Sequence, residues 1–151
     1  MSTDVEVEAV REITGEIAEA FARLIPQLTS SGRAPDAAEL AEIVAAPSTV
    51  VLVARVGGAV AGTATLMTYR TPTGARGRIE DVVVHAGARG RGVGEALTEG
   101  ALAEAGRRGV RSVDLTSRPS REAANRLYRR MGFVARDSVV YRHTTNTAYN
   151  T

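Results

Sequence analysis

A glycine-dense, basic loop between an apolar strand and a helix is the feature that most constrains the fold of this chain. Residues 89–94 read Arg-Gly-Arg-Gly-Val-Gly, after a strand-like run at 79–84 and before a helix-like run from Val93 to about Arg108. Glycines let the backbone approach a ligand closely, and a helix N-terminus offers free N–H groups and a dipole that favours an anion. Arg89 and Arg91 add forked cationic donors. The pattern therefore predicts a phosphate-binding junction.

Length and composition exclude several classes of protein. The 151 residues predict one domain, 1–151, whose polar end at 144–151 is expected to be flexible. The chain has no cysteine and only two histidines, so we expect no disulfide, no acyl-cysteine intermediate and no metal site. No apolar run approaches 18 residues and the N-terminus lacks a signal-peptide pattern, so we expect a cytoplasmic protein without a membrane partner.

Charge is distributed unevenly along the chain. All 19 basic residues are arginines, and most of them lie between residues 70 and 130, whereas acidic residues are frequent in the first fifty. An acidic partner such as a nucleotide would prefer the second half. The net charge is only +2, which argues against a nucleic-acid partner.

Hydrophobic periodicity predicts the order β-α-α-β-β-β-α-β-α-β-β. Gly57-Gly58 is a two-residue hairpin signal, and a loop is expected at 71–76. The elements are predicted as strand 3–10, helices 14–28 and 35–46, strands 49–56, 59–70 and 77–84, helix 93–108, strand 111–116, helix 121–131, and strands 133–135 and 138–143. The fold class is therefore α/β, with a mixed, mostly antiparallel sheet, one parallel pair and helices on both faces.

Two segments carry a resemblance to a known family. Arg89-x-x-Gly92-x-Gly94 fits the pattern Gln/Arg-x-x-Gly-x-Gly/Ala, and the stretch from Ala124 to Phe133 fits Ala-x-x-Leu-Tyr-x-x-x-Gly-Phe. Together with the element order, they resemble the GNAT superfamily of acetyl-coenzyme A dependent N-acetyltransferases, over about residues 49–143. The resemblance implies the GNAT fold, acetyl-CoA as co-substrate, and acetyl transfer to a primary amine by direct attack.

The resemblance also implies where coenzyme A binds. The pyrophosphate would lie against residues 89–95, and the pantetheine along the main chain of 82–84, where the amide of Val82 or Val83 would polarise the thioester carbonyl. The implied cofactor-binding residues are Val82, Val83, Val84, Arg89, Gly90, Arg91, Gly92, Val93, Gly94 and Glu95. Three other interpretations of the glycine loop fit less well. A Walker A loop would continue with Gly-Lys-Ser/Thr, which is absent here, and a dinucleotide-binding loop would have a different glycine spacing. An Arg-Gly segment that binds nucleic acid would contain interleaved aromatic residues, which are also absent.

Tyr128 matches the family's general acid, which would protonate the departing thiolate and contact the cofactor. The alternative for Tyr128 is a core tyrosine with a satisfied hydroxyl. Glu80 is the first candidate for the base that deprotonates the amine, and Asp81 the second; the alternative for both is acceptor binding or solvation. Regular strand alternation would place Glu80 on one face with Val82 and Val84, opposite Asp81.

One position departs from the family pattern. The family often has a pantetheine-binding asparagine seven residues before the tyrosine, where this chain has Arg121. Asn125, three residues before Tyr128, is the other candidate for this contact, and a solvated surface charge is the alternative for Arg121.

The sequence contains no motif that specifies the acceptor amine. A small amine such as an amino sugar or amino acid is favoured over a protein N-terminus or lysine, and the run from Arg78 to Val84 resembles the fourth strand of glucosamine-phosphate acetyltransferases. A second hypothesis is a non-catalytic acyl-CoA-binding sensor of the same fold. Dimers are common in the resembled family, so a homodimer stays open.

Overall fold

The computed structural model describes residues 4–30 and 32–146, and these residues divide into two compact units, one ending at Leu115 and the other beginning at Thr116. The end of the expected flexible tail, 147–151, lies outside the described residues. In chain order the elements are β1 (Val5–Ala9), α1 (Gly15–Leu28), α2 (Ala37–Ala45), β2 (Thr49–Val56), β3 (Ala59–Thr71), β4 (Gly74–Val84), the 3-10 turn η1 (Ala86–Ala88), α3 (Val93–Arg107), β5 (Val113–Asp114) and α4 (Glu122–Arg130).

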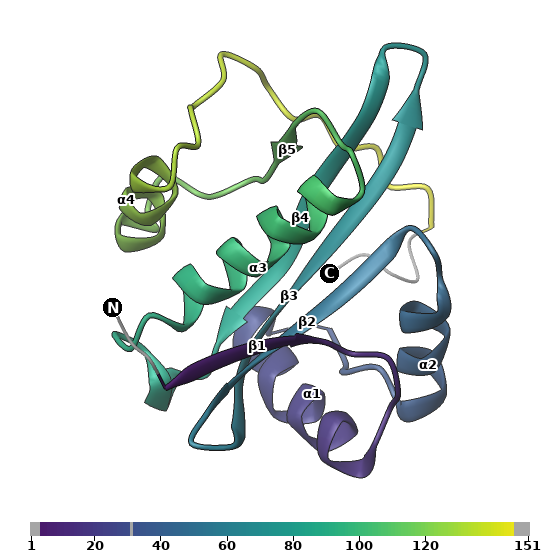
Figure 1. The fold of residues 1–151 in the computed structure, drawn as a ribbon, viewed down its shortest axis with the longest axis vertical. Helices are drawn as coiled ribbons and strands as arrows, with labels where there is room; N and C mark the ends of the chain where they lie inside the picture. The colour runs from purple at the N-terminus through teal and green to yellow at the C-terminus, as the bar shows by residue number, and fades with distance from the viewer. Residues whose placement is uncertain (1–3, 31, 147–151) are drawn as a thin grey trace. The chain divides into compact units, whose positions relative to one another are not determined.

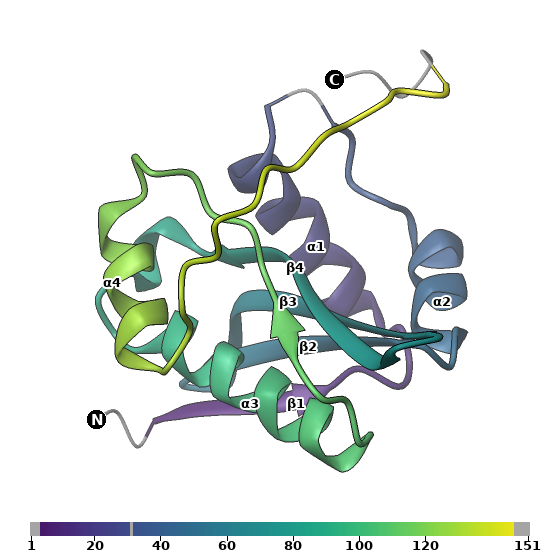
Figure 2. The same cartoon turned by 90° about the horizontal axis from the view of Figure 1, so that it is seen from above.

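The first unit contains one five-stranded sheet in the order β1-β2-β3-β4-β5 (Figure 1). Neighbouring strands are antiparallel except β4 and β5, which are parallel. A parallel pair needs a crossover, and α3 supplies it. Helices α1 and α2 cover one face of the sheet and α3 the other (Figure 2). The predicted mixed α/β sheet with one parallel pair is confirmed.

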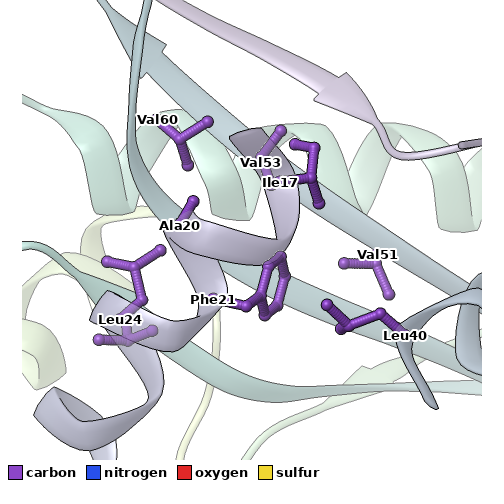
Figure 3. Packing of buried hydrophobic residues seen from close by; sticks show 9 residues of the cluster. Ile17, Ala20, Phe21, Leu24, Leu40, Val51, Val53 and Val60 are labelled. Carbon is purple, nitrogen blue, oxygen red and sulfur yellow. The ribbon is translucent and has the colours of Figure 1, made fainter. Parts of the chain in front are cut away.

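The core beneath α1 forms as the helical period predicts. Thr14 caps α1, because its hydroxyl accepts a hydrogen bond from the amide of Ile17. Pro26 does not end the helix, which continues to Leu28. The buried residues on this face come from α1, α2 and the sheet (Figure 3): Ile17, Ala20, Phe21, Leu24, Leu40, Val51, Val53, Val60 and Val83.

Helix α2 begins later than predicted. Asp36 is its N-cap and forms a reciprocal capping box with Glu39, so Pro35 lies before the cap rather than at the first helical position. Arg33 donates to both carboxylate oxygens of Glu39, at 2.9 and 3.1 Å, and holds the pKa of that carboxyl at about 2.

The hairpin between β3 and β4 is longer than predicted. The expected loop at 71–76 is reduced to a tight turn, because Thr71 pairs with Gly74 and the ladder continues through the pair Tyr69 and Arg76. Gly74 has a φ of 135°, which a residue with a side chain rarely adopts. This hairpin extends beyond α1 and α2 (Figure 1).

In the second unit, α4 forms as predicted, but the two final strands do not. Residues 133–146 contain no strand, so the prediction of strands at 133–135 and 138–143 is wrong. Val134 and Tyr141 are 80% and 90% exposed. Because strand preference reflects packing on a half-buried surface, β-branched residues without such a surface do not form a strand. The predicted strand 111–116 is also reduced to Val113–Asp114.

Gly62 on β3 allows α3 to approach the sheet closely. A Cβ built there would lie 2.9 Å from the carbonyl oxygen of Val83, 3.0 Å from Val93 Cγ1 and 3.2 Å from Leu97 Cδ1. The glycine therefore lies where β3, β4 and the start of α3 meet.

We expect Gly62→Ala to lower the free energy of unfolding by about 1–3 kcal/mol, because the added methyl group overpacks this junction. Gly106→Ala is the matched control: its Cβ would meet nothing within 4 Å, and alanine should raise helix stability by about 0.5–1 kcal/mol. Urea unfolding measures the free energy of unfolding of both variants. A Gly62→Ala protein as stable as the wild type would contradict the close packing.

Candidate functional site

The middle of β4 contains a β-bulge. On β3, Thr63 and Thr65 are two residues apart, whereas their partners on β4, Val83 and Glu80, are three apart. One extra residue is therefore inserted into β4. Asp81, within this bulge, has a φ of 53° and is the only residue other than glycine with a positive φ in the described part of the chain. Aspartate tolerates this left-handed conformation better than most residues, and bulges often reorient groups at functional sites.

The bulge changes which face of the sheet the neighbouring side chains occupy. Val83 is buried in the core beneath α1, and Glu80 lies on that same face, opposite Thr65. The expectation that Glu80 shares a face with Val82 and Val84 is therefore wrong. The physical reason is the inserted residue, because a shift of one residue in a strand exchanges the two faces.

Beyond the bulge, β4 has a strand neighbour on one side only. Its parallel pairing with β5 consists of Gly77 with Val113 and Arg78 with Asp114, and no strand of the described residues pairs with 79–84 along that edge. Main-chain groups of 82–84 on this edge are therefore not used by the sheet. A ligand with amide groups could extend along the edge as a further strand would.

The glycine loop follows directly and places a helix start at the end of β4. Gly90 and Gly92 both have a φ of 80°, and Gly92 is the N-cap of α3 with no side-chain cap hydrogen bond. Ala88 and Val93 are buried on either side and anchor the loop. The N–H groups of the first turn of α3 thus point out of a helix start that no side chain caps, which fits an anion.

The charged side chains predicted to lie at this helix start differ in their surroundings. Arg89 and Arg91 are exposed beside the two left-handed glycines. Glu95, also predicted to bind the cofactor, lies half-buried in the first turn of α3 and has an interaction partner within the protein. The helix dipole stabilises the Glu95 carboxylate, but this carboxylate would repel a phosphate. Only the main chain of Glu95 therefore suits the predicted role.

Gln27 is a residue of this region that the sequence analysis missed. Its side-chain nitrogen lies 3.0 Å from His85 Nδ1, and its side-chain oxygen accepts a 2.9 Å hydrogen bond from the amide of Ala86. The last turn of α1 is thereby connected to the segment that leads into the glycine loop. No local pattern signals this contact, because the partners are 58 and 59 residues apart in the chain.

The two carboxylates proposed as bases have different surroundings. Glu80 forms an ion pair with Arg78 on the α1 face. Asp81 remains in contact with solvent, but partial burial raises the pKa of its carboxyl, and the negative charge of Glu80 raises it further. A raised pKa makes Asp81 a stronger base than an ordinary aspartate.

Tyr128 belongs to the second unit, on the buried face of α4. Its ring makes an edge-on contact with Phe133 at 5.7 Å between ring centroids, and its carbonyl accepts a 2.9 Å hydrogen bond from the Phe133 amide. Burial raises the pKa of the Tyr128 phenol, and the positive charge of Arg121 opposes this in part. The phenol is therefore protonated at neutral pH, as a general acid requires.

The two candidates for the pantetheine contact also lie on or beside α4. Arg121 is the exposed N-cap residue of α4, and its side chain makes no cap hydrogen bond. The side-chain amide of Asn125 donates a 3.0 Å hydrogen bond to the carbonyl of Arg118. The amide of Asn125 is thus partly occupied within the unit.

One solvent-open cavity formed by described residues lies away from the glycine loop. It has a volume of about 950 Å³, is open to solvent, and lies beside the C-terminal end of α3 and the tip of the β3–β4 hairpin. Its lining includes Pro47, Thr68, Arg70, Pro72, Arg108 and Val110. None of the predicted site residues lines it. Within the described residues there is also no cluster of three or more metal-ligating His, Asp or Glu side chains.

The described part of the chain has no helix that combines the length and the apolar composition needed to cross a membrane.

We expect Asp81→Asn to stabilise the protein at neutral pH. The folded protein binds a proton at Asp81 more tightly than the unfolded chain, so stability falls as pH rises from the ordinary value of 3.8 through the raised pKa. Asparagine also tolerates the left-handed backbone but carries no charge. Thermal unfolding should show a higher Tm for the variant at pH 7, and the difference should shrink below pH 3.8. A difference independent of pH would contradict an ionisation effect.

Several solved structures share the fold of this chain. A search of curated proteins found no match. Among solved structures, an acetyltransferase of Trypanosoma brucei has a TM-score of 0.77 at 25% identity, covering 93% of this chain and 100% of that one. The glucosamine-6-phosphate N-acetyltransferase of Arabidopsis thaliana has a TM-score of 0.78 at 22% identity (94% and 99% covered). AAC(6')-Iy, solved with a bisubstrate analogue of coenzyme A, has a TM-score of 0.75 at 20% identity (94% and 99% covered).

At these identities the last two structures show a shared fold. The family assignment comes from the sequence model of the acetyltransferase (GNAT) family, which matches residues 16–133. That match includes strands β2 to β5, the bulge, the glycine loop and the chain through α4 to Phe133. The chain therefore belongs to the GNAT acetyltransferase family.

Proposed function

We propose that this protein, acting as a single GNAT domain, transfers the acetyl group of acetyl-CoA to a primary amine. The observation that carries the proposal is the continuous arrangement of β4 and α3. A bulged strand with one unpaired edge leads directly into an uncapped helix start with two left-handed glycines. This arrangement suits a long ligand that carries a pyrophosphate at one end and amide groups along its length.

In this proposal the pyrophosphate binds at the start of α3. The glycines at 90 and 92 let the loop approach the phosphates, the first-turn N–H groups donate to them, and Arg89 and Arg91 supply positive charge. The pantetheine then follows the edge of β4 at 82–84. Arg121 and Asn125 remain the two proposed contacts from the second unit.

The bulge has a proposed role in the reaction itself. Inserting a residue turns a main-chain N–H out of the regular ladder, and we assign the amide of Val82 or Val83 as the donor to the thioester oxygen. A donor aimed at the oxygen that becomes negative in the transition state is worth about 2.7–4 kcal/mol in comparable enzymes. A rigid strand places such a donor without a cost of reorganisation at the moment of reaction.

The proposed step is direct transfer. The neutral amine attacks the acetyl carbonyl carbon, the new C–N bond forms, and the C–S bond breaks with its electron pair moving to sulfur. Asp81 or Glu80 takes the proton that the amine loses, directly or through water, and the Tyr128 hydroxyl protonates the thiolate. The protonated state of Tyr128 and the raised pKa of Asp81 support these roles.

We propose a small amine as acceptor. One similar structure is a glucosamine-6-phosphate N-acetyltransferase, and another, AAC(6')-Iy, was solved with a bisubstrate analogue that contains acetylneamine. Both of these similar proteins are thus named with small amino sugars, which supports a small acceptor for the present chain. The proposal includes a cytoplasmic location and involves no nucleic acid or metal. It is compatible with either a monomer or a homodimer.

We expect Gly92→Glu to abolish acetyl-CoA binding measured by calorimetry, because a carboxylate at this N-cap repels the pyrophosphate and strains the backbone. Gly109→Glu is the matched control, because Gly109 has a φ of 71° and follows the other end of α3. This substitution adds the same charge and a similar backbone strain, but far from the start of the helix. The control should bind as the wild type does. No binding of acetyl-CoA to the wild type would overturn the proposed co-substrate.

We expect Tyr128→Phe to lower kcat about 10²- to 10⁴-fold while acetyl-CoA affinity stays within a few-fold, because the variant loses the proton but keeps the ring. Steady-state kinetics and calorimetry measure the two quantities. An unchanged kcat would exclude the acid role. Tight acetyl-CoA binding without turnover of any amine would instead favour a non-catalytic sensor.

A further inference from the structure

The β3–β4 hairpin carries a strip of side chains on its α1 face that the core does not use. The ladder pairs Met67 with Arg78 and Tyr69 with Arg76, and residues directly opposite each other in a ladder point to the same face. Glu80 continues the strip toward the bulge. We call these five residues the hairpin strip.

The face to which the strip belongs follows from the register. Glu80 pairs with Thr65, and Thr65 pairs with Val51, which is buried in the core beneath α1 and α2. Side chains two residues apart along a strand share a face, so Met67 and Tyr69 extend this face beyond the core. The other face of the hairpin carries Leu66 instead, which is fully buried.

The apolar members of the strip are open to solvent. Met67 and Tyr69 are each 42% exposed, although they are large side chains next to a formed core. They lie side by side across from two arginines. An aromatic and a thioether beside guanidinium groups form a surface that suits a small ligand with both an apolar skeleton and an anionic group.

Charge changes sign along the strip. At the end nearer the hairpin turn, Arg76 donates a 2.7 Å hydrogen bond to the Thr73 hydroxyl, and no carboxylate of the described residues forms an ion pair with it. At the end nearer the bulge, Glu80 pairs with Arg78, and Asp81 follows. The strip thus runs from Arg76, which has no ion-pair partner among the described residues, to Glu80, whose carboxylate pairs with Arg78 and directly precedes the bulge at Asp81.

From this polarity we infer that the acceptor is a small amine that also carries an anionic group, a phosphate or a carboxylate, with its amine toward Glu80 and its anion toward Arg76. The inference rests on the proposed acetyl transfer at the bulge. The amine end meets Glu80 and the proposed reaction centre, and the anionic end meets Arg76. A plain polyamine would place a second cation against Arg76, which disfavours it.

Strand geometry sets the size of this acceptor. Residues two apart along β4, such as Glu80 and Arg78, are separated by about 7 Å, and residues four apart, such as Glu80 and Arg76, by about 13 Å. Arginine side chains reach toward a ligand and shorten these separations. The amine and the anion of the acceptor should therefore lie within the length of a single sugar or amino acid rather than that of a peptide.

The test compares two matched pairs of amines by kcat/KM with saturating acetyl-CoA. Comparing glucosamine 6-phosphate with glucosamine measures the contribution of a phosphate to kcat/KM. Comparing lysine with cadaverine measures the contribution of a carboxylate. We expect the wild type to favour the anionic member of at least one pair by about tenfold or more, as for hydrogen bonds between charged groups. The pair that shows the preference identifies the anion.

Arg76→Met should remove most of that preference, while kcat/KM for the pair member without the anionic group should not fall. Arg70→Met is the matched control, since Arg70 lies on the same hairpin but pairs with Ala75 on the opposite face. This control should retain the preference. Thermal unfolding of both variants verifies that each is folded.

Four outcomes would overturn the inference, and the last of them can be told apart from the others. Equal kcat/KM within both pairs, or an equal loss in both arginine variants, refutes the role of the strip and leaves the acetyltransferase intact. Acetyl-CoA binding with acetylation of none of the four amines also refutes it. Absence of acetyl-CoA binding refutes the proposed function itself, on which the inference rests.

Discussion

The ladder between β3 and β4 is the interaction on which the rest of the candidate site depends. Its one irregularity, the extra residue at Asp81, sets the positions of the groups on both sides of it. Toward the hairpin turn, Glu80 and the strip point to the α1 face. Toward the glycine loop, Val83 enters the core and Val84 ends the strand. A regular strand would reverse one of these two halves, because strand side chains alternate.

The helix start is held in place by the same pair of strands. Gly62 on β3 lies against the carbonyl of Val83 and the side chain of Val93, so the strand just beyond the bulge and the first turn of α3 share one close contact. Gln27 adds a second connection, from α1 to the segment before the loop. The candidate phosphate site is therefore positioned by packing from both faces of the sheet, although its proposed ligand contacts are main-chain groups.

Local chemistry explains which features could be predicted. The turn at Gly57-Gly58, the buried stripe of α1 and the glycine loop each depend on neighbouring residues, and all three form as expected. The helix boundaries were within about two residues where a cap or glycine marks them. The late strands at 133–135 and 138–143 were not predictable in this way, because strand residues form strands only against a partner and a buried surface.

By itself, the sequence determined the element order up to α4, the glycine motif and the presence of Glu80, Asp81 and Tyr128, because these follow from short-range periodicity and residue identity. Only the tertiary structure decided the face on which Glu80 lies, the raised pKa of Asp81 and the exposure of the hairpin strip. The physical reason is that a bulge arises from the register between two strands. Register is a property of the pair, and no single stretch of sequence contains it.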